Sequence, residues 1–202
     1  MATHFARGIL TEGQLVSIRL SSSCHIEARN LPAHRRTRFL ASRGLLAELM
    51  FMLYGISELP EIIIQAKGKP AFRDKNLPSF SISYAGNMVG VALTTEGECG
   101  LDMELQRTSR GFHHPHSLER HPFSRNENLW VANQNDPNEA RAQLITLRQS
   151  VLKLTGDVMN DDPRELQLLP VAGRLKCAHV TQLEAVCDAE DVLVWSVTVT
   201  PA

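Results

Sequence analysis

Two acidic residues, Asp102 and Glu104, follow an apolar stretch and are separated by one residue. On a β-strand, side chains at positions i and i+2 lie on the same face, so this spacing predicts two carboxylates side by side. Two like charges held close together are costly unless a cation lies between them. Because Mg²⁺ prefers carboxylate and phosphate oxygens, the pair indicates half of a metal–phosphate site. The alternative interpretation is an exposed acidic strand end.

A helix is predicted to begin at Asp136 and to run to about Leu154. Asp136 is typical of an N-cap, Pro137 of the first helical position, and Glu139 of the third position in a capping box. Gly156 is the expected C-terminal cap. This helix would give its side chains fixed positions relative to the acidic strand.

Gln149 and Lys153 are four residues apart on the predicted helix and therefore share a face. The side-chain oxygen of Gln149 can complete a metal site, and Lys153 can neutralise phosphate. The alternative is that both residues belong to a solvated polar face.

The remaining elements are a long helix and several short strands. Apolar residues recur at helical spacing from Leu31–Pro32 to about Tyr54. A turn at 85–87 is expected to join two strands into a hairpin. The predicted strands are Gln14–Leu20, Ile62–Ile64, Ser79–Tyr84, Met88–Thr94, Gly100–Leu105, Glu165–Leu169, Lys176–Val180 and Val192–Val199.

Each half of the chain combines a long helix with strand-rich segments, which predicts an α+β fold with an internal duplication. Each half is expected to pack its long helix on a mainly antiparallel sheet. The predicted N-terminal half is 1–106, with the first metal ligands at its end, and the predicted C-terminal half is 107–202. The polar segment 106–122, rich in Arg, His and Ser, is expected to be a long loop at the seam.

The composition bounds the class of protein. The 202 residues are 43% hydrophobic and 21% charged, as in an ordinary globular protein. A net charge of -1 argues against a nucleic-acid binder that relies on a broad basic surface. The four cysteines lack the spacing of a zinc site or a disulfide framework. The N-terminus lacks a long apolar region and no apolar segment reaches membrane-spanning length, so a cytoplasmic protein without a membrane partner is expected.

Four blocks in a fixed order make the chain resemble a known enzyme family. It is similar to the 4′-phosphopantetheinyl transferases of the larger, pseudo-dimeric type, such as the surfactin-synthetase-activating enzymes. The blocks are an arginine-bearing helix at Arg36–Arg43, a Gly-Lys-Pro turn at Gly68–Phe72, the segment Phe80–Gly86 leading into Gly100–Glu104, and Arg148–Lys153 preceded by Phe123–Glu127. Each block alone is weak, but their order and spacing together are specific.

The resemblance implies a reaction and a set of partners. The family transfers the 4′-phosphopantetheine arm of coenzyme A to a serine of an apo acyl or peptidyl carrier protein. Adenosine 3′,5′-bisphosphate leaves, and Mg²⁺ bridges the diphosphate of coenzyme A. Such phosphoryl transfer depends on positioning and on charge neutralisation. The resemblance also implies that the nucleotide binds in a cleft between the halves, and that the protein is a monomer.

The resemblance assigns roles to individual residues. Asp102, Glu104 and the position of Gln149 match the metal ligands, and Lys153 matches the lysine that contacts the diphosphate. These four are the expected catalytic residues. The expected coenzyme-binding residues are Arg36, Arg43, Lys69, Pro70, Ser83 and Tyr84.

Three positions depart from the family pattern. The family has Trp at Ile145, His at Tyr84 and Glu at Gln149. The third departure matters most, because that Glu is both a metal ligand and a proposed general base, and an amide cannot accept the serine proton. One hypothesis is that a metal-bound water or another carboxylate serves as the base. The other is a degenerate paralogue that binds coenzyme A or a carrier protein without transferring anything.

Overall fold

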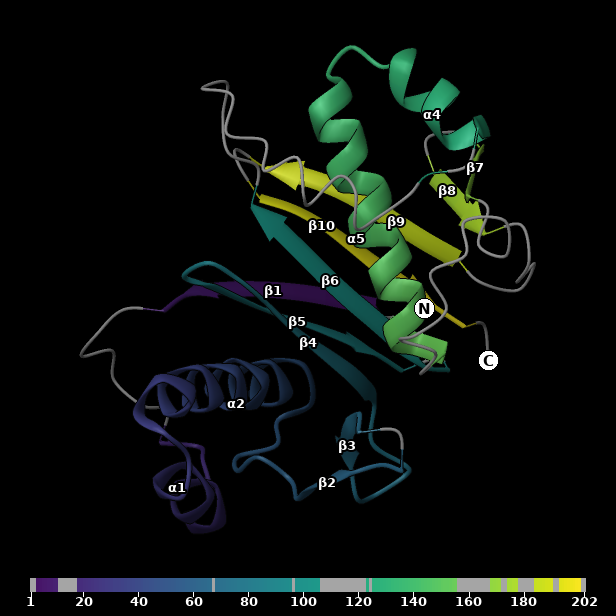
Figure 1. Ribbon diagram of the computed structural model, residues 1–202. Coiled ribbons are helices and arrows are strands. Elements are labelled where there is room, and N and C mark those ends of the chain that lie inside the picture. Colours follow the sequence, from purple (N-terminus) through teal and green to yellow (C-terminus); the bar gives the residue numbers. More distant parts are fainter. Residues whose placement is uncertain are drawn as a thin grey trace. The chain divides into compact units, whose positions relative to one another are not determined.

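The computed structural model combines helices with antiparallel strands, which confirms the predicted α+β class (Figure 1). The structure describes residues 3–10, 18–66, 68–95, 97–105, 123, 125–155, 168–171, 174–177, 184–190 and 193–200. The chain divides into two compact units, Met1–Thr95 and Glu96–Ala202, called unit 1 and unit 2 below.

Unit 1 packs a long helix against a three-stranded antiparallel sheet of order β1-β5-β4. Its elements are β1 Thr3–Ile9, α1 Ser22–Arg29, α2 Ala33–Tyr54, β2 Ile62–Ile64, β3 Pro70–Phe72, β4 Ser79–Ala85 and β5 Met88–Thr94. Strands β2 and β3 form a separate hairpin. Leu46 and Met50 of α2 are fully buried together with Val91 and Leu93 of β5, so the core of this unit lies between helix and sheet.

Unit 2 packs its long helix against a three-stranded antiparallel sheet of order β6-β10-β9. Its elements are β6 Cys99–Leu105, α4 Arg125–Ala132, α5 Pro137–Thr155, β7 Leu168–Val171, β8 Arg174–Cys177, β9 Glu184–Glu190 and β10 Leu193–Val199. Figure 1 shows α5 lying across this sheet. Leu144, Leu147 and Val151 of α5 form an apolar cluster with Val131 of α4.

The two units have the same topology in their described parts. In each, an outer strand comes first, two helices follow, a separate hairpin comes next, and the last strand lies between the other two strands of the sheet. The predicted boundary at Gln106 lies just after β6, whereas the boundary of the compact units lies just before it. The arrangement of the two units as a pseudo-dimer stays a prediction.

Several predicted elements are confirmed at their expected positions. Helix α2 ends at Tyr54, where Gly55 adopts a left-handed conformation with φ 69°. The side chain of Asp136 accepts hydrogen bonds from the backbone of Asn138 and Glu139, both at 3.2 Å, so Asp136 is the N-cap of α5. Hairpin β4–β5 and strand β10 also match their predictions.

Other predictions need correction. The first strand is Thr3–Ile9. The predicted strand Gln14–Leu20 is wrong at positions 18–20, which form a turn, and its positions 14–17 lie outside the described residues. Helices α1 and α4 were not predicted. The expected strands Glu165–Leu169 and Lys176–Val180 overlap β7 and β8 but lie in part outside the described residues. The loop 106–122 and the cap at Gly156 lie entirely outside them.

Candidate active site

Strand β6 places Asp102 and Glu104 on the face of its sheet that is covered by α5. Gly100 lies on the same face, and a Cβ atom added there would collide with the carbonyl oxygen of Ser150 in α5. Leu101 and Met103 alternate with them and are buried on the opposite face. The absence of a side chain at Gly100 therefore allows α5 to approach the strand that carries the acidic pair.

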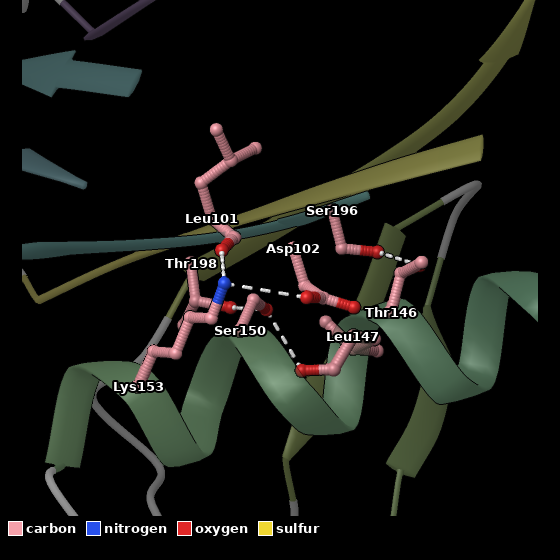
Figure 2. Close-up of polar contacts among 8 residues, drawn as sticks. All are labelled: Leu101, Asp102, Thr146, Leu147, Ser150, Lys153, Ser196 and Thr198. Atoms are coloured by element: carbon pink, nitrogen blue, oxygen red, sulfur yellow. Dashed lines mark hydrogen bonds and ion pairs between the residues drawn. The ribbon is translucent and has the colours of Figure 1, made fainter. Parts of the chain in front are cut away.

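Lys153 of α5 reaches across to β6. Its Nζ atom donates a hydrogen bond to the carbonyl oxygen of Leu101 at 2.9 Å and pairs with Oδ1 of Asp102 at 3.3 Å. Figure 2 shows the Asp102 carboxylate above α5, between Lys153 and Thr146. The side chains of Lys153 and Asp102 are 33% and 18% exposed, so the pair is partly withdrawn from solvent.

Glu104 is held in an environment that disfavours its charge. Burial, and secondly the negative charge of Asp102, raise the pKa of Glu104 from 4.5 to about 7. Its Oε2 atom is buried and has no hydrogen-bond partner within the described residues. A divalent cation between the two carboxylates would satisfy this oxygen and offset the repulsion, so the residues present fit a metal of the Mg²⁺ class.

Gln149 lies one helical turn before Lys153, on the side of α5 that faces the sheet. Its neighbours on that side, Thr146 and Ser150, both form hydrogen bonds to β10. Within the described residues, no group of three His, Cys, Asp or Glu side chains is placed to hold a metal. Among the described residues, the amide oxygen of Gln149 is a candidate for a third protein ligand beside the acidic pair.

Two pairs of buried hydroxyl groups join α5 to β10. Thr146 and Ser196 are 2.7 Å apart, and Ser150 and Thr198 are 2.5 Å apart, measured between their hydroxyl oxygens. All four residues are fully buried. In the strand register Ser196 is the partner of Asp102, so the hydroxyl pairs fix the helix beside the acidic strand. The helical i, i+4 spacing of Thr146 and Ser150 is a sequence signal for one face of α5, but it does not predict their partners on β10.

The predicted coenzyme-binding arginines lie in α2 of unit 1. Arg36 donates hydrogen bonds to the carbonyl oxygens of Ala28 at 3.0 Å and Leu31 at 3.2 Å, so its guanidinium group joins α2 to the end of α1. Arg43 is 9% exposed and lies over the ring of Phe39 at 4.7 Å. Burial lowers the pKa of Arg43 below its usual value. Both arginines therefore have local structural contacts, and their coenzyme contacts stay predictions.

The other predicted coenzyme-binding residues also belong to unit 1. Lys69 and Pro70 follow Gly68, whose φ of 83° marks the turn before β3. Ser83 of β4 is buried. Its neighbour Tyr84 donates a hydrogen bond from its hydroxyl group to a backbone carbonyl of α2 at 3.3 Å. The structure thus brings together Asp102, Glu104 and Lys153 in unit 2, with Gln149 on the adjoining helix face, and holds the six expected coenzyme-binding residues in unit 1.

Among the described helices, none has the length and apolar character needed to cross a membrane.

Comparison with known proteins gives two kinds of match. Parts of the chain are similar to the 4′-phosphopantetheinyl transferase AcpT. The identity to AcpT of Escherichia coli K12 is 41% over 73 residues, which is 36% of this chain and 34% of that protein. The identity to AcpT of Salmonella typhi is 29% over 124 residues, which is 60% of each protein. No family model matches the chain.

The second match extends over the whole chain. The uncharacterized protein YieE of Escherichia coli K12 is 81% identical over 201 residues, which is 100% of this chain and 81% of that protein. The similarity of the chain to AcpT is distant and partial, whereas its match to YieE shows that the chain belongs to the YieE family.

Proposed function

We propose that the chain transfers the 4′-phosphopantetheine arm of coenzyme A to a serine of an apo acyl or peptidyl carrier protein. The observation that carries this proposal is the acidic pair on β6 with Lys153 of α5 beside it. The partial similarity to AcpT supports the same class of reaction. Phosphoryl transfer needs positioned positive charge around a diphosphate, and this site can assemble such charge.

In this proposal each group of residues has a separate task. Asp102, Glu104 and the Gln149 oxygen would hold Mg²⁺, which supplies charge neutralisation at the diphosphate when bound. Lys153 would donate hydrogen bonds to a diphosphate oxygen. Arg36, Arg43, Lys69, Pro70, Ser83 and Tyr84 would bind the remainder of the coenzyme. The chain would form the pseudo-dimer of the larger type, with the predicted halves 1–106 and 107–202, and act as a cytoplasmic monomer.

The reaction breaks one phosphorus–oxygen bond and forms another. The carrier serine oxygen attacks the phosphorus that bears pantetheine, and adenosine 3′,5′-bisphosphate leaves with the bridging oxygen. The serine proton must pass to a base other than Gln149, because an amide at neutral pH accepts no proton. A bound water or another carboxylate would serve, and the rate would be lower than with a carboxylate at position 149.

Gln149 also favours a second candidate function. A chain that lost its general base can keep its binding surfaces and act as a degenerate paralogue that binds coenzyme A or a carrier protein without catalysis. Only the first function yields a modified carrier, so the product distinguishes the two functions.

The test is to incubate the chain with coenzyme A and either Mg²⁺ or Mn²⁺, together with several apo carrier proteins, and to weigh the carriers by mass spectrometry. A mass gain equal to phosphopantetheine that disappears with Asp102→Ala supports transfer. Unmodified carriers together with tight coenzyme A binding support the non-catalytic paralogue. If the carriers stay unmodified and neither coenzyme A nor an apo carrier protein raises the melting temperature, both functions are wrong.

A further inference from the structure

We propose that Lys153 is a built-in counter-cation for Asp102, and that a divalent cation binds the acidic pair only by displacing it. Lys153 would then set the metal affinity of the site, in addition to its expected contact with the diphosphate. This inference rests on the proposed function because it concerns the same metal site.

The contacts of Lys153 show a side chain that is fixed on the acidic strand. Its Nζ atom binds both the carbonyl oxygen of Leu101 and Oδ1 of Asp102, so two consecutive residues of β6 hold one ammonium group. The side chain starts on α5 and crosses to the strand (Figure 2). Because the pair is partly buried, solvent screens its attraction less than it screens a surface ion pair.

A divalent cation and the ammonium group compete for this position. Two positive charges beside one carboxylate oxygen repel each other strongly where water is partly excluded. The lysine stem has several rotatable bonds, so the ammonium group can leave Asp102 without moving α5. After it leaves, its donors are available to an anion, which an ammonium group binds through up to three hydrogen bonds.

This competition couples the two ligands of the site. With both carboxylates ionised, Asp102, Glu104 and Lys153 together carry one negative charge, so loading a divalent cation leaves one excess positive charge. A diphosphate neutralises that excess through both the cation and Lys153. The site would therefore bind the cation weakly alone and more tightly together with a diphosphate.

The test is a titration of the metal-stripped full chain with Mn²⁺ alone, with free Mn²⁺ measured by electron paramagnetic resonance. Lys153→Met keeps the length of the stem and removes the charge, and it should bind Mn²⁺ roughly 5- to 50-fold more tightly than the wild type. Lys153→Arg keeps the charge and should stay close to the wild-type affinity. Arg125→Met removes an exposed positive charge from α4 and is the matched control, for which no change is expected.

Three results would overturn the inference. Lys153→Met could bind Mn²⁺ no more tightly than the wild type, or Arg125→Met could tighten binding equally, which would indicate a bulk charge effect. If no variant binds Mn²⁺, the metal site and the proposed transfer are wrong as well, whereas equal binding by all variants contradicts only the role of Lys153. A melting curve establishes that Lys153→Met is folded, and Lys153→Gln replaces it if it is not.

Discussion

The two units share a topology but fill the layer between helix and sheet with opposite chemistry. In unit 1, Ala6 of β1 and its register partner Val91 of β5 pack in the apolar cluster with α2. We match the units by counting along equivalent strands, β1 with β6 and β5 with β10. In unit 2, the matched positions are Asp102 of β6 and Ser196 of β10. The next matched pair along the last strand is Leu93 in unit 1 and Thr198 in unit 2.

The layer between helix and sheet mainly stabilises the fold in unit 1, whereas in unit 2 it mainly positions charged and polar side chains. Apolar burial contributes about 25 cal/mol per Å² of area, and unit 1 uses it where Leu46 and Met50 of α2 are buried with Val91 and Leu93 of β5. Unit 2 replaces it with hydroxyl pairs and an ion pair, each of which contributes only about 1 kcal/mol net. Unit 2 obtains apolar burial on the other side of α5, against α4. A polar layer maintained at this cost is expected at a functional site.

The largest expected effect comes from exchanging the chemistry at the matched strand positions. Asp102→Asn keeps the volume but removes a ligand charge, and it should lower the transfer rate by a factor on the order of 10³. Ala6→Ser adds a polar group at the matched position of unit 1 and should leave transfer within about twofold. The rates are measured by mass spectrometry of the carrier. An equal loss in both variants would remove the distinction between the units.

The raised pKa of Glu104 makes the stability of the folded chain depend on pH. The matched residue of unit 1 is Gly8, which has no titratable side chain. In the unfolded chain the proton leaves near 4.5, and in the folded chain near 7. The folded state therefore binds more protons in this window, and its stability falls as the pH rises through it. The penalty above the window is at most about 3 kcal/mol.

Glu104→Gln removes this penalty. The variant should be more stable than the wild type at about pH 8, and the difference should vanish toward about pH 3, below both pKa values of the carboxyl, where it is protonated in the folded and the unfolded state. Urea unfolding in the presence of a chelator measures both free energies. If the free energies of unfolding of the two proteins change with pH in parallel, the pKa of Glu104 is not raised in the folded state.

Two glycines test how closely each helix approaches its outer strand. Gly100→Ala forces the new Cβ atom against the Ser150 carbonyl oxygen and should destabilise the chain by about 1–3 kcal/mol. Among the described residues, the new Cβ atom of Gly8→Ala in unit 1 meets Cγ1 of Val89 at 3.8 Å, an ordinary contact, so the change in stability should be no more than about 0.5 kcal/mol. Chemical denaturation of both variants measures the contrast, and similar losses would show that α5 has room to shift.

The smallest expected effect concerns position 149 of unit 2, where the proposed function would favour a carboxylate. Gln149→Glu returns a base and a ligand charge to the sheet-facing side of α5, and it should raise the transfer rate about tenfold or more. Steady-state turnover at saturating coenzyme A measures the change. An unchanged or slower rate in an active enzyme would show that Gln149 is not the limiting departure from the family pattern.

Local signals were sufficient to predict the elements that carry the acidic site. The apolar run with two spaced acids predicted β6, and the cap at Asp136 predicted the start of α5. The matched strand β1 is not predictable from the sequence pattern, because its helix-facing residues Ala6 and Gly8 are small. The strand therefore lacks the alternation of large apolar and polar residues that indicates a half-buried strand. The partnership of Thr146 with Ser196 depends on the order of strands in the sheet, which no local pattern contains.

The central claim is that the acidic pair on β6 seats a divalent cation and the diphosphate of coenzyme A. The most direct measurement is a crystal structure of the chain grown with Mn²⁺ and coenzyme A, with Mn²⁺ located by its anomalous scattering. The account predicts an anomalous peak between the carboxylates of Asp102 and Glu104, with a diphosphate oxygen bonded to Lys153. A coenzyme whose diphosphate lies away from both carboxylates, or Mn²⁺ bound elsewhere on the chain, would contradict it.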